Sequence, residues 1–146
     1  MKARWLTIFL MLVAALAATT KFAYDLGKVK KPGKTFNASC QDLTQACRVN
    51  MDGTAIELMF SPEPALLKPF MLTVKVPGAK DVVAVFTMVG MDMGINRYRL
   101  QAVEGGHWQA KIILPACISR RSDWLLTLEI DGYKVKVPFS AAKAGG

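Results

Sequence analysis

Residues 124–139 read WLLTLEIDGYKVKVPF, which is the pattern of two β-strands joined by a tight turn. Apolar side chains alternate with others on both sides of Asp131-Gly132, at Trp124, Leu126, Leu128 and Ile130 and then at Tyr133, Val135, Val137 and Phe139. A period of two places these side chains on one face of a strand, and Asp-Gly is a strong signal for a two-residue hairpin turn. The segment predicts an antiparallel hairpin with one buried face.

The same period recurs in the residues that precede this hairpin. It predicts strands at residues 56–60, 70–76, 98–102 and 108–114, with breaks rich in Pro and Gly between them. Residues 82–88 are continuously apolar, as in a strand that is buried on both faces. The turn glycines Gly105-Gly106 predict a second hairpin, from Tyr98 to Leu114. No amphipathic helix lies between the strands. About seven half-polar strands predict an all-β fold, an immunoglobulin-like antiparallel sandwich.

The first residues have the pattern of an export signal. Met1-Lys2-Ala3-Arg4 precedes an apolar run from Trp5 to Ala18, which is expected to be helical. Either this run is removed, at a small-x-small site such as Ala15-Leu16-Ala17, or it stays as a short N-terminal transmembrane helix, a signal-anchor. The expected organisation is a leader at 1–20, a basic linker at 21–36 and a β-sandwich domain at 37–142.

The distribution of charge bears on location and partners. The formal net charge is +8, but two cations lie in the leader and five lysines lie in the linker, so the domain is nearly balanced. No nucleic-acid partner is expected, because there is no basic stripe interleaved with aromatic residues. The linker lysines alone favour a cytoplasmic domain by the positive-inside rule. The short basic start and the cysteines outweigh them, so the domain is expected at the periplasmic face of the inner membrane.

Two of the three cysteines, Cys40 and Cys47, bracket a short segment before the first predicted strand. In an exported protein this spacing predicts a disulfide that closes a small loop. Structural zinc usually uses more closely spaced pairs, and a thioredoxin-like redox pair has two intervening residues rather than six. A thiol-redox role for this pair is a third, weaker possibility.

Three methionines, Met88, Met91 and Met93, lie within six positions in the segment Met88-Val89-Gly90-Met91-Asp92-Met93-Gly94. Thioether sulfur is a soft neutral ligand that Cu(I) accepts, so the cluster is a candidate copper site. Methionine also fills irregular gaps in hydrophobic cores, and core packing is the alternative interpretation.

The odd cysteine, Cys117, is a possible fourth ligand. It follows Pro115 in a loop that contains Arg120 and Arg121, whose charges would lower the pKa of its thiol. The alternative is a small buried apolar side chain. If the strands run up and down in order, this loop and the Met segment lie at one end of the sandwich.

The remaining candidates are charged or titratable side chains. Arg97 and Arg99 share one face of a strand, where they are either solvated or pair with an acidic partner. His107, the single histidine, is expected at the surface beside the Gly-Gly turn, with a metal role as the alternative. No catalytic constellation emerges, so the protein is not expected to be an enzyme.

The segment from Val85 to Val137, a little over a third of the chain, resembles the FixH/YtkA-like family of small exported β-sandwich domains. The resemblance is carried by the Met segment, the strand Asn96–Ala102, Gly105-Gly106 with Trp108-Gln109-Ala110, Leu114-Pro115, and Asp123-Trp124. It implies a membrane-tethered protein associated with copper handling or with assembly of haem-copper oxidases.

Together these observations favour a membrane-tethered accessory protein that binds Cu(I) through Met88, Met91, Met93 and Cys117. Its expected partners are the inner membrane and a respiratory oxidase subunit or a copper chaperone. The competing class is a metal-free protein-interaction module of the cell envelope, in which the methionines are adaptable contacts.

Overall fold

The computed structural model describes residues 33–88, 90–91, 96–116 and 121–143, together with Trp5, Ile8 and Met11. Pro32–Gly146 form one compact unit, which holds all of the strands. Apart from Trp5, Ile8 and Met11, the predicted leader lies outside the described residues, and so does the predicted linker as far as residue 32. In the part of the chain that is described, no helix combines the length and apolar character needed to span a bilayer.

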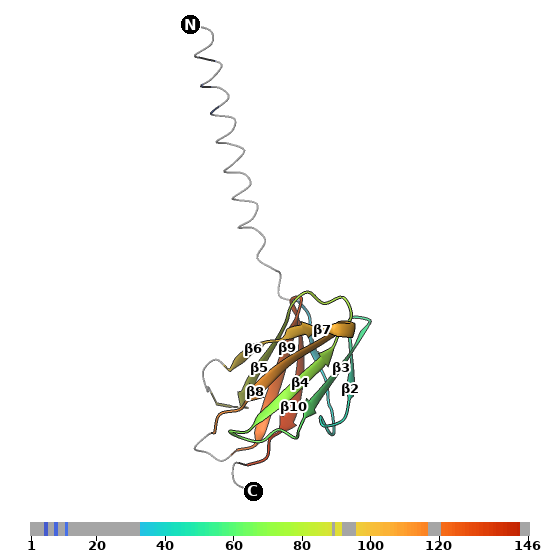
Figure 1. Cartoon of the computed structure of the whole chain (residues 1–146), viewed down its shortest axis with the longest axis vertical. Helices are drawn as coiled ribbons and strands as arrows, with labels where there is room; N and C mark the ends of the chain where they lie inside the picture. Colours follow the sequence, from blue (N-terminus) through green and yellow to red (C-terminus); the bar gives the residue numbers. More distant parts are fainter. Residues whose placement is uncertain are drawn as a thin grey trace. The chain divides into compact units, whose positions relative to one another are not determined.

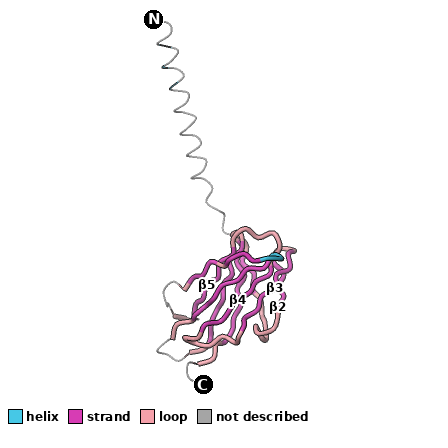
Figure 2. Tube along the Cα trace, in the orientation of Figure 1, coloured by secondary structure: helices cyan, strands magenta, loops and turns pink. Residues whose placement is uncertain are grey.

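Two five-stranded sheets make up this unit, and they are visible as two layers in Figure 1 and Figure 2. One sheet, called sheet A here, has the order β1 (Thr35–Asn37), β10 (Tyr133–Ser140), β9 (Asp123–Ile130), β5 (Val82–Met88) and β6 (Arg97–Arg99). Sheet B has the order β2 (Cys47–Met51), β3 (Thr54–Ser61), β4 (Pro69–Lys75), β8 (His107–Ile113) and β7 (Gln101–Val103). A 3₁₀ turn, η1 (Glu104–Gly106), joins β7 to β8. The all-β prediction is confirmed.

The predicted hairpin at residues 124–139 is confirmed as β9 and β10. Ile130 lies opposite Tyr133, and the intervening turn residues both have positive φ, 48° at Asp131 and 99° at Gly132. Such angles suit Asp and Gly, which tolerate the left-handed region better than other residues. The inward side chains of this hairpin, from Trp124 to Ile130 and at Val135 and Val137, are buried as the alternation predicts.

The core lies between the inner faces of the two sheets. From sheet B it receives Ile56, Leu58, Phe60, Phe70, Leu72, Val74, Ile112 and Leu114, all at most 2% exposed. Aromatic rings meet across the layers: the ring centroid of Phe60 in sheet B lies 5.1 Å from that of Phe139 in sheet A, and the ring centroid of Phe70 lies 6.3 Å from that of Phe86. Edge-to-face contacts at these distances add to the burial energy of the rings.

The predicted hairpin from Tyr98 to Leu114 is only partly correct, because the chain changes sheets at Leu100. β6 pairs with β5 in sheet A, the N–H of Leu100 donates to the carbonyl of Val82 at 2.9 Å, and β7 then pairs with β8 in sheet B. Leu100 is 2% exposed at this crossing. The alternating pattern predicts a single strand at residues 98–102. In the structure this segment forms two strands, because it connects the edge of sheet A to the edge of sheet B.

The strand count also differs from the prediction of about seven, because the described residues form ten strands. The division of residues 98–102 adds one strand, and β1 and β2 add two more. β1 has only three residues, whereas β2 does alternate, with Cys47, Val49 and Met51 on one face, and the prediction missed it. β1 pairs with β10 in parallel, so the sandwich is not wholly antiparallel. β1 begins at Thr35, inside the range that the sequence assigned to the linker.

The chain enters sheet A at the end that carries the β9–β10 turn. The N–H of Gly33 donates to the carbonyl of Gly132 at 2.9 Å, and the position of a Cβ on Gly33 would lie only 2.7 Å from the carbonyl carbon of Gly132. Because β10 runs away from this turn, Met88 and Trp124 mark the opposite end of the sheet. The two ends of the sandwich therefore have different roles: one joins the N-terminal segment and the other carries the candidate site.

Candidate functional site

Met88, the first predicted copper ligand, is the last residue of β5 and belongs to the core. Its side chain is 3% exposed and lies opposite Trp124 of β9. Val82, Ala84 and Phe86 share its face of the strand and are likewise buried. The thioether of Met88 therefore packs between the sheets, as the alternative interpretation holds.

Met91 follows a turn at Gly90, whose φ is 76°. The N–H of Met91 donates to the carbonyl of Met88 at 3.3 Å, so the chain folds back immediately after β5. The Met91 side chain is partly buried and packs against the core cluster. Met93, together with Asp92, lies outside the described residues.

Neighbouring strands bring the two candidate loops to one end of sheet A. β5 ends at Met88 directly beside the start of β9 at Trp124, and a Cβ on Gly90 would lie 4.0 Å from an Nη atom of Arg121. The Met segment leaves β5 at this end, and the loop with Cys117 enters β9 here. Cys117 and Arg120 themselves lie outside the described residues.

Arg121 makes its strongest described contact with Asp123. Its Nε donates to one carboxylate oxygen of Asp123 at 2.8 Å, and an Nη donates to the other, which gives a bidentate pair. The hydrogen bond from Arg121 lowers the pKa of the Asp123 carboxyl. The charge of Arg121 is therefore compensated locally by Asp123.

Two buried N–H donors flank Met88 and were not recognised from the sequence. Trp124 lies directly opposite it, and Asn96 lies opposite Phe86, whose N–H donates to the Asn96 carbonyl at 2.9 Å. Among the described residues, neither the Trp124 Nε1 nor the Asn96 Nδ2 finds an acceptor. Buried donors are usually satisfied, so this end of the core has unused hydrogen-bonding capacity. Only the tertiary pairing of β5 with β6 and β9 reveals it.

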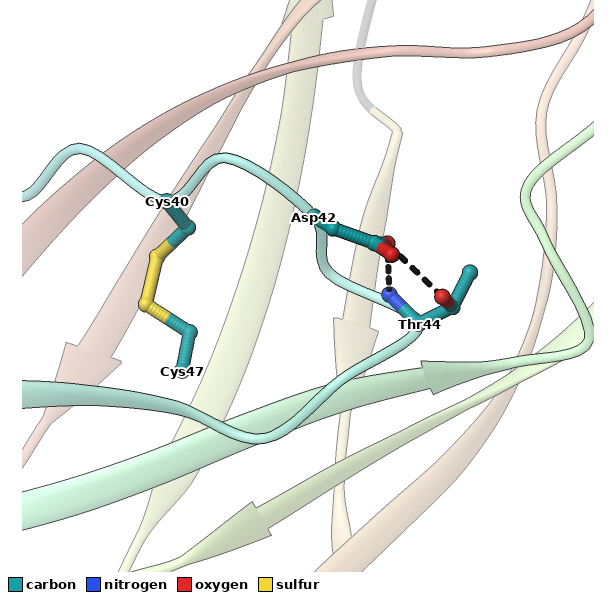
Figure 3. Close-up of a disulfide and its surroundings, with 4 residues drawn as sticks. All are labelled: Cys40, Asp42, Thr44 and Cys47. Carbon is teal, nitrogen blue, oxygen red and sulfur yellow. Dashed lines mark hydrogen bonds between the residues drawn. A yellow bond between two sulfur atoms is a disulfide. The ribbon is translucent and has the colours of Figure 1, made fainter.

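The predicted disulfide between Cys40 and Cys47 is present, with 6.0 Å between the two Cα atoms (Figure 3). Asp42 organises the enclosed loop by accepting hydrogen bonds from the N–H of Thr44 at 2.8 Å and from its hydroxyl at 2.7 Å. These bonds lower the pKa of the Asp42 carboxyl, the hydroxyl having the larger effect. The loop thus has both a covalent and a hydrogen-bonded closure.

A hollow of about 470 Å³ lies beside this loop, at the same end of the sandwich as Met88. Its lining contains the carboxylates of Asp42, Glu63 and Asp123 and no Lys or Arg. Leu43 forms part of the wall; it is 6% exposed, and its carbonyl accepts the N–H of Phe60 at 2.6 Å. Nothing in the sequence spacing of these residues indicates that they meet.

Arg97 and Arg99 lie side by side on the outer face of β6, and each forms an ion pair within the chain. An Nη of Arg97 lies 2.7 Å from a carboxylate oxygen of Glu129, and the Nε of Arg99 lies 3.3 Å from one of Asp81. Both arginines remain exposed. The prediction of a shared face is correct, and part of their charge is already paired.

His107 begins β8 beside the turn glycines and is half-buried. Its Nδ1 lies 3.1 Å from the carbonyl oxygen of Glu104 in η1. Across the described ranges, no three or more His, Cys, Asp or Glu side chains gather in a way that would hold a metal ion.

Comparison of the chain with models of protein families, with curated proteins and with solved structures gave no match. The geometry at the Met88 end, the hollow beside the disulfide loop and the exposed arginines are therefore interpreted on their own chemistry.

Proposed function

We propose that this protein is an exported, membrane-tethered accessory in copper handling or haem-copper oxidase assembly, and that it binds Cu(I) through soft sulfur ligands. The observation that carries the proposal is the pairing of Met88 with Trp124, because it brings the ends of the Met segment and of the Cys117 loop together. Thioethers with a thiol form a donor set that suits Cu(I).

The residues fit such a site unequally. Met88 is 3% exposed in the core, so it is the least suited of the four, whereas Met91 is only partly buried at the start of the loop. Met91, Met93 and Cys117 are therefore the proposed principal ligands. The resemblance to the FixH/YtkA-like family supports the same function, an immunoglobulin-like arrangement and a location at the periplasmic face of the inner membrane. It also supports an oxidase subunit or a copper chaperone as partner.

Replacement of Met91 and Met93 by Leu tests the proposal. Leu conserves volume and costs under about 1.5 kcal/mol even at a packed position, so the fold is kept while the sulfur is lost. Titration of the full-length protein in mild detergent with Cu(I), against a colorimetric chelator, should give binding in the parent and at least a tenfold weaker affinity in the variant.

A matched control is available in the same chain. Met59 and Met71 lie on the outer face of sheet B, away from the Met segment, so their replacement by Leu removes as many thioethers and should leave Cu(I) affinity unchanged. Equal loss in both double variants, or a parent that cannot compete with the chelator, contradicts the copper proposal.

The second candidate is a metal-free interaction module, and the packing of Met88 and Met91 against the core favours it. In that case the methionines serve as adaptable apolar contacts. The Leu variant would then resemble the parent in every binding measurement.

A further inference from the structure

A second hollow, of about 530 Å³, lies where the chain crosses from sheet A to sheet B at Leu100. We call it the crossing groove. β6 and β7 meet on either side of this crossing (Figure 1), and β8 completes the wall. It is lined by Met71, Arg97, Tyr98, Arg99, Gln101, Val103, Gln109, Ala110 and Lys111.

The charge of the crossing groove is of one sign. Arg97, Arg99 and Lys111 line it, and no carboxylate is among its described lining residues. The arginines are held in place by Glu129 and Asp81, whose contacts engage only some of the five N–H groups of each guanidinium. Their side chains are 48% and 76% exposed, so the remaining donors are accessible. Lys111 is exposed on β8.

The backbone of the crossing groove is an open sheet edge. β7 is the last strand of sheet B, and within the described residues it pairs only with β8. All three of its residues are exposed. The outward N–H and C=O groups of an edge strand are a template for an added strand, which is a common mode of peptide recognition.

Apolar and amide side chains complete the lining. Val103 is 44% exposed and Met71 is 37% exposed, so both apolar side chains are accessible in the crossing groove. The amide of Gln109 donates to the hydroxyl of Thr73 at 3.3 Å, which fixes its position on the face of sheet B. The crossing groove thus offers cations, amides and apolar surface along one strand edge.

We propose that the crossing groove binds an extended, acidic segment of a partner protein, which adds a strand to the edge at β7. Arg97 and Arg99 are two residues apart on one strand face, a spacing of roughly 6.8 Å, which equals the spacing of alternate side chains in an extended peptide. Carboxylates at alternate positions would meet these cations, and an apolar side chain on the same face of the segment would contact Val103 on β7. The proposal uses none of the sulfur residues of the copper site, so it stands or falls independently of copper binding.

Binding of synthetic peptides to the full-length protein in mild detergent tests this inference by fluorescence anisotropy. A short labelled peptide of alternating Glu and Val should bind, and the same peptide with Gln for Glu should bind several-fold more weakly. Lys111→Glu should weaken binding of the acidic peptide about fivefold, which is the scale expected when one exposed attraction between charges becomes a repulsion. Lys75→Glu makes the same change of charge outside the groove, and it should alter the affinity less than about twofold.

Four results would overturn the inference. Equal weakening by Lys75→Glu and Lys111→Glu would mean a general charge effect. Unchanged affinity for an acidic peptide N-methylated at alternate backbone positions would exclude strand addition, because those N–H groups could no longer pair. If polyphosphate of matched charge displaces the acidic peptide as well as unlabelled peptide does, the groove is a general anion surface. If the protein dimerises in sedimentation and Lys111→Glu abolishes the dimer, a second copy of the chain is the occupant.

Discussion

Asp131 fastens the β9–β10 turn to the loop before β5, and its replacement by Ala should be among the most destabilising changes at the surface. Its carboxylate accepts the N–H of Lys80 at 3.1 Å and that of Asp81 at 3.0 Å, and its own N–H donates to the Asp81 carbonyl at 3.2 Å. Its φ of 48° also lies in the left-handed region. Alanine loses the carboxylate contacts and tolerates the backbone angle poorly.

The cost divides into two parts. Two half-exposed hydrogen bonds to a carboxylate contribute about 1.5 kcal/mol together, and the left-handed angle costs an alanine about 1 kcal/mol more than a glycine. We therefore expect Asp131→Ala to lose about 2.5 kcal/mol and Asp131→Gly about 1.5 kcal/mol. Asp131→Asn keeps an acceptor oxygen and tolerates the angle, so it should lose less than about 1 kcal/mol.

Urea unfolding of the full-length protein in mild detergent, followed by far-ultraviolet circular dichroism, measures all three variants against the parent. A loss of about 2.5 kcal/mol corresponds to a fall of about 10 °C or more in Tm for a domain of this size. If Asp131→Ala and Asp131→Gly are equally stable, the backbone part of the reasoning is wrong. If all three variants match the parent, the contacts to Lys80 and Asp81 contribute nothing.

Three further expectations concern the disulfide, a strained leucine and an acid-sensitive ion pair. The double change Cys40→Ser and Cys47→Ser should lower the free energy of unfolding in urea by about 2.4 kcal/mol, the loop entropy for a sequence separation of 7. If the disulfide is the cause, this variant and the reduced parent protein should be equally stable. A difference in stability between them would count against it. Leu67 has a φ of 62° and is 59% exposed, so Leu67→Gly should be about 1 kcal/mol more stable than Leu67→Ala in thermal unfolding, and the opposite order would refute strain at this position. The hydrogen bond from Arg121 lowers the pKa of Asp123 from 3.8, so the ionised carboxylate stabilises the fold above that pH. This contribution is lost as the pH falls through the pKa of the folded state. Asp123→Asn lacks the carboxylate, so it should lose less stability than the parent between about pH 5 and pH 2.

Local sequence patterns were sufficient to predict the strands that are defined by residues close to one another in the sequence. Asp131-Gly132 fixed one hairpin, alternation located β3, β4 and β8 within one or two residues, and a continuous apolar run located β5. Because that run does not alternate, it predicted the burial of the strand but did not distinguish copper binding from core packing for Met88. Patterns of period two therefore located most of the core.

Features that depend on contacts between distant segments were not predictable. The change of sheet at Leu100 follows from pairing with Val82 on one side and with β8 on the other, and neither partner is visible in the segment itself. β1 is recognisable only because Thr35 lies beside Lys134. The unsatisfied donors of Trp124 and Asn96 likewise depend on three strands meeting at one end of the core.

The crossing at Leu100 has a further consequence for how the domain opens. On that side the chain runs directly from the edge of one sheet into the edge of the other, and the Tyr98 hydroxyl donates to the Ile113 carbonyl at 2.8 Å across the junction. On the other side, the segment between β1 and β2 joins the opposite edges and contains the disulfide loop. Neither sheet can separate from the other while both of these connections are intact. The slowest amide protons of β5 and β9 should therefore exchange with solvent at the same opening free energy as those of β4 and β8.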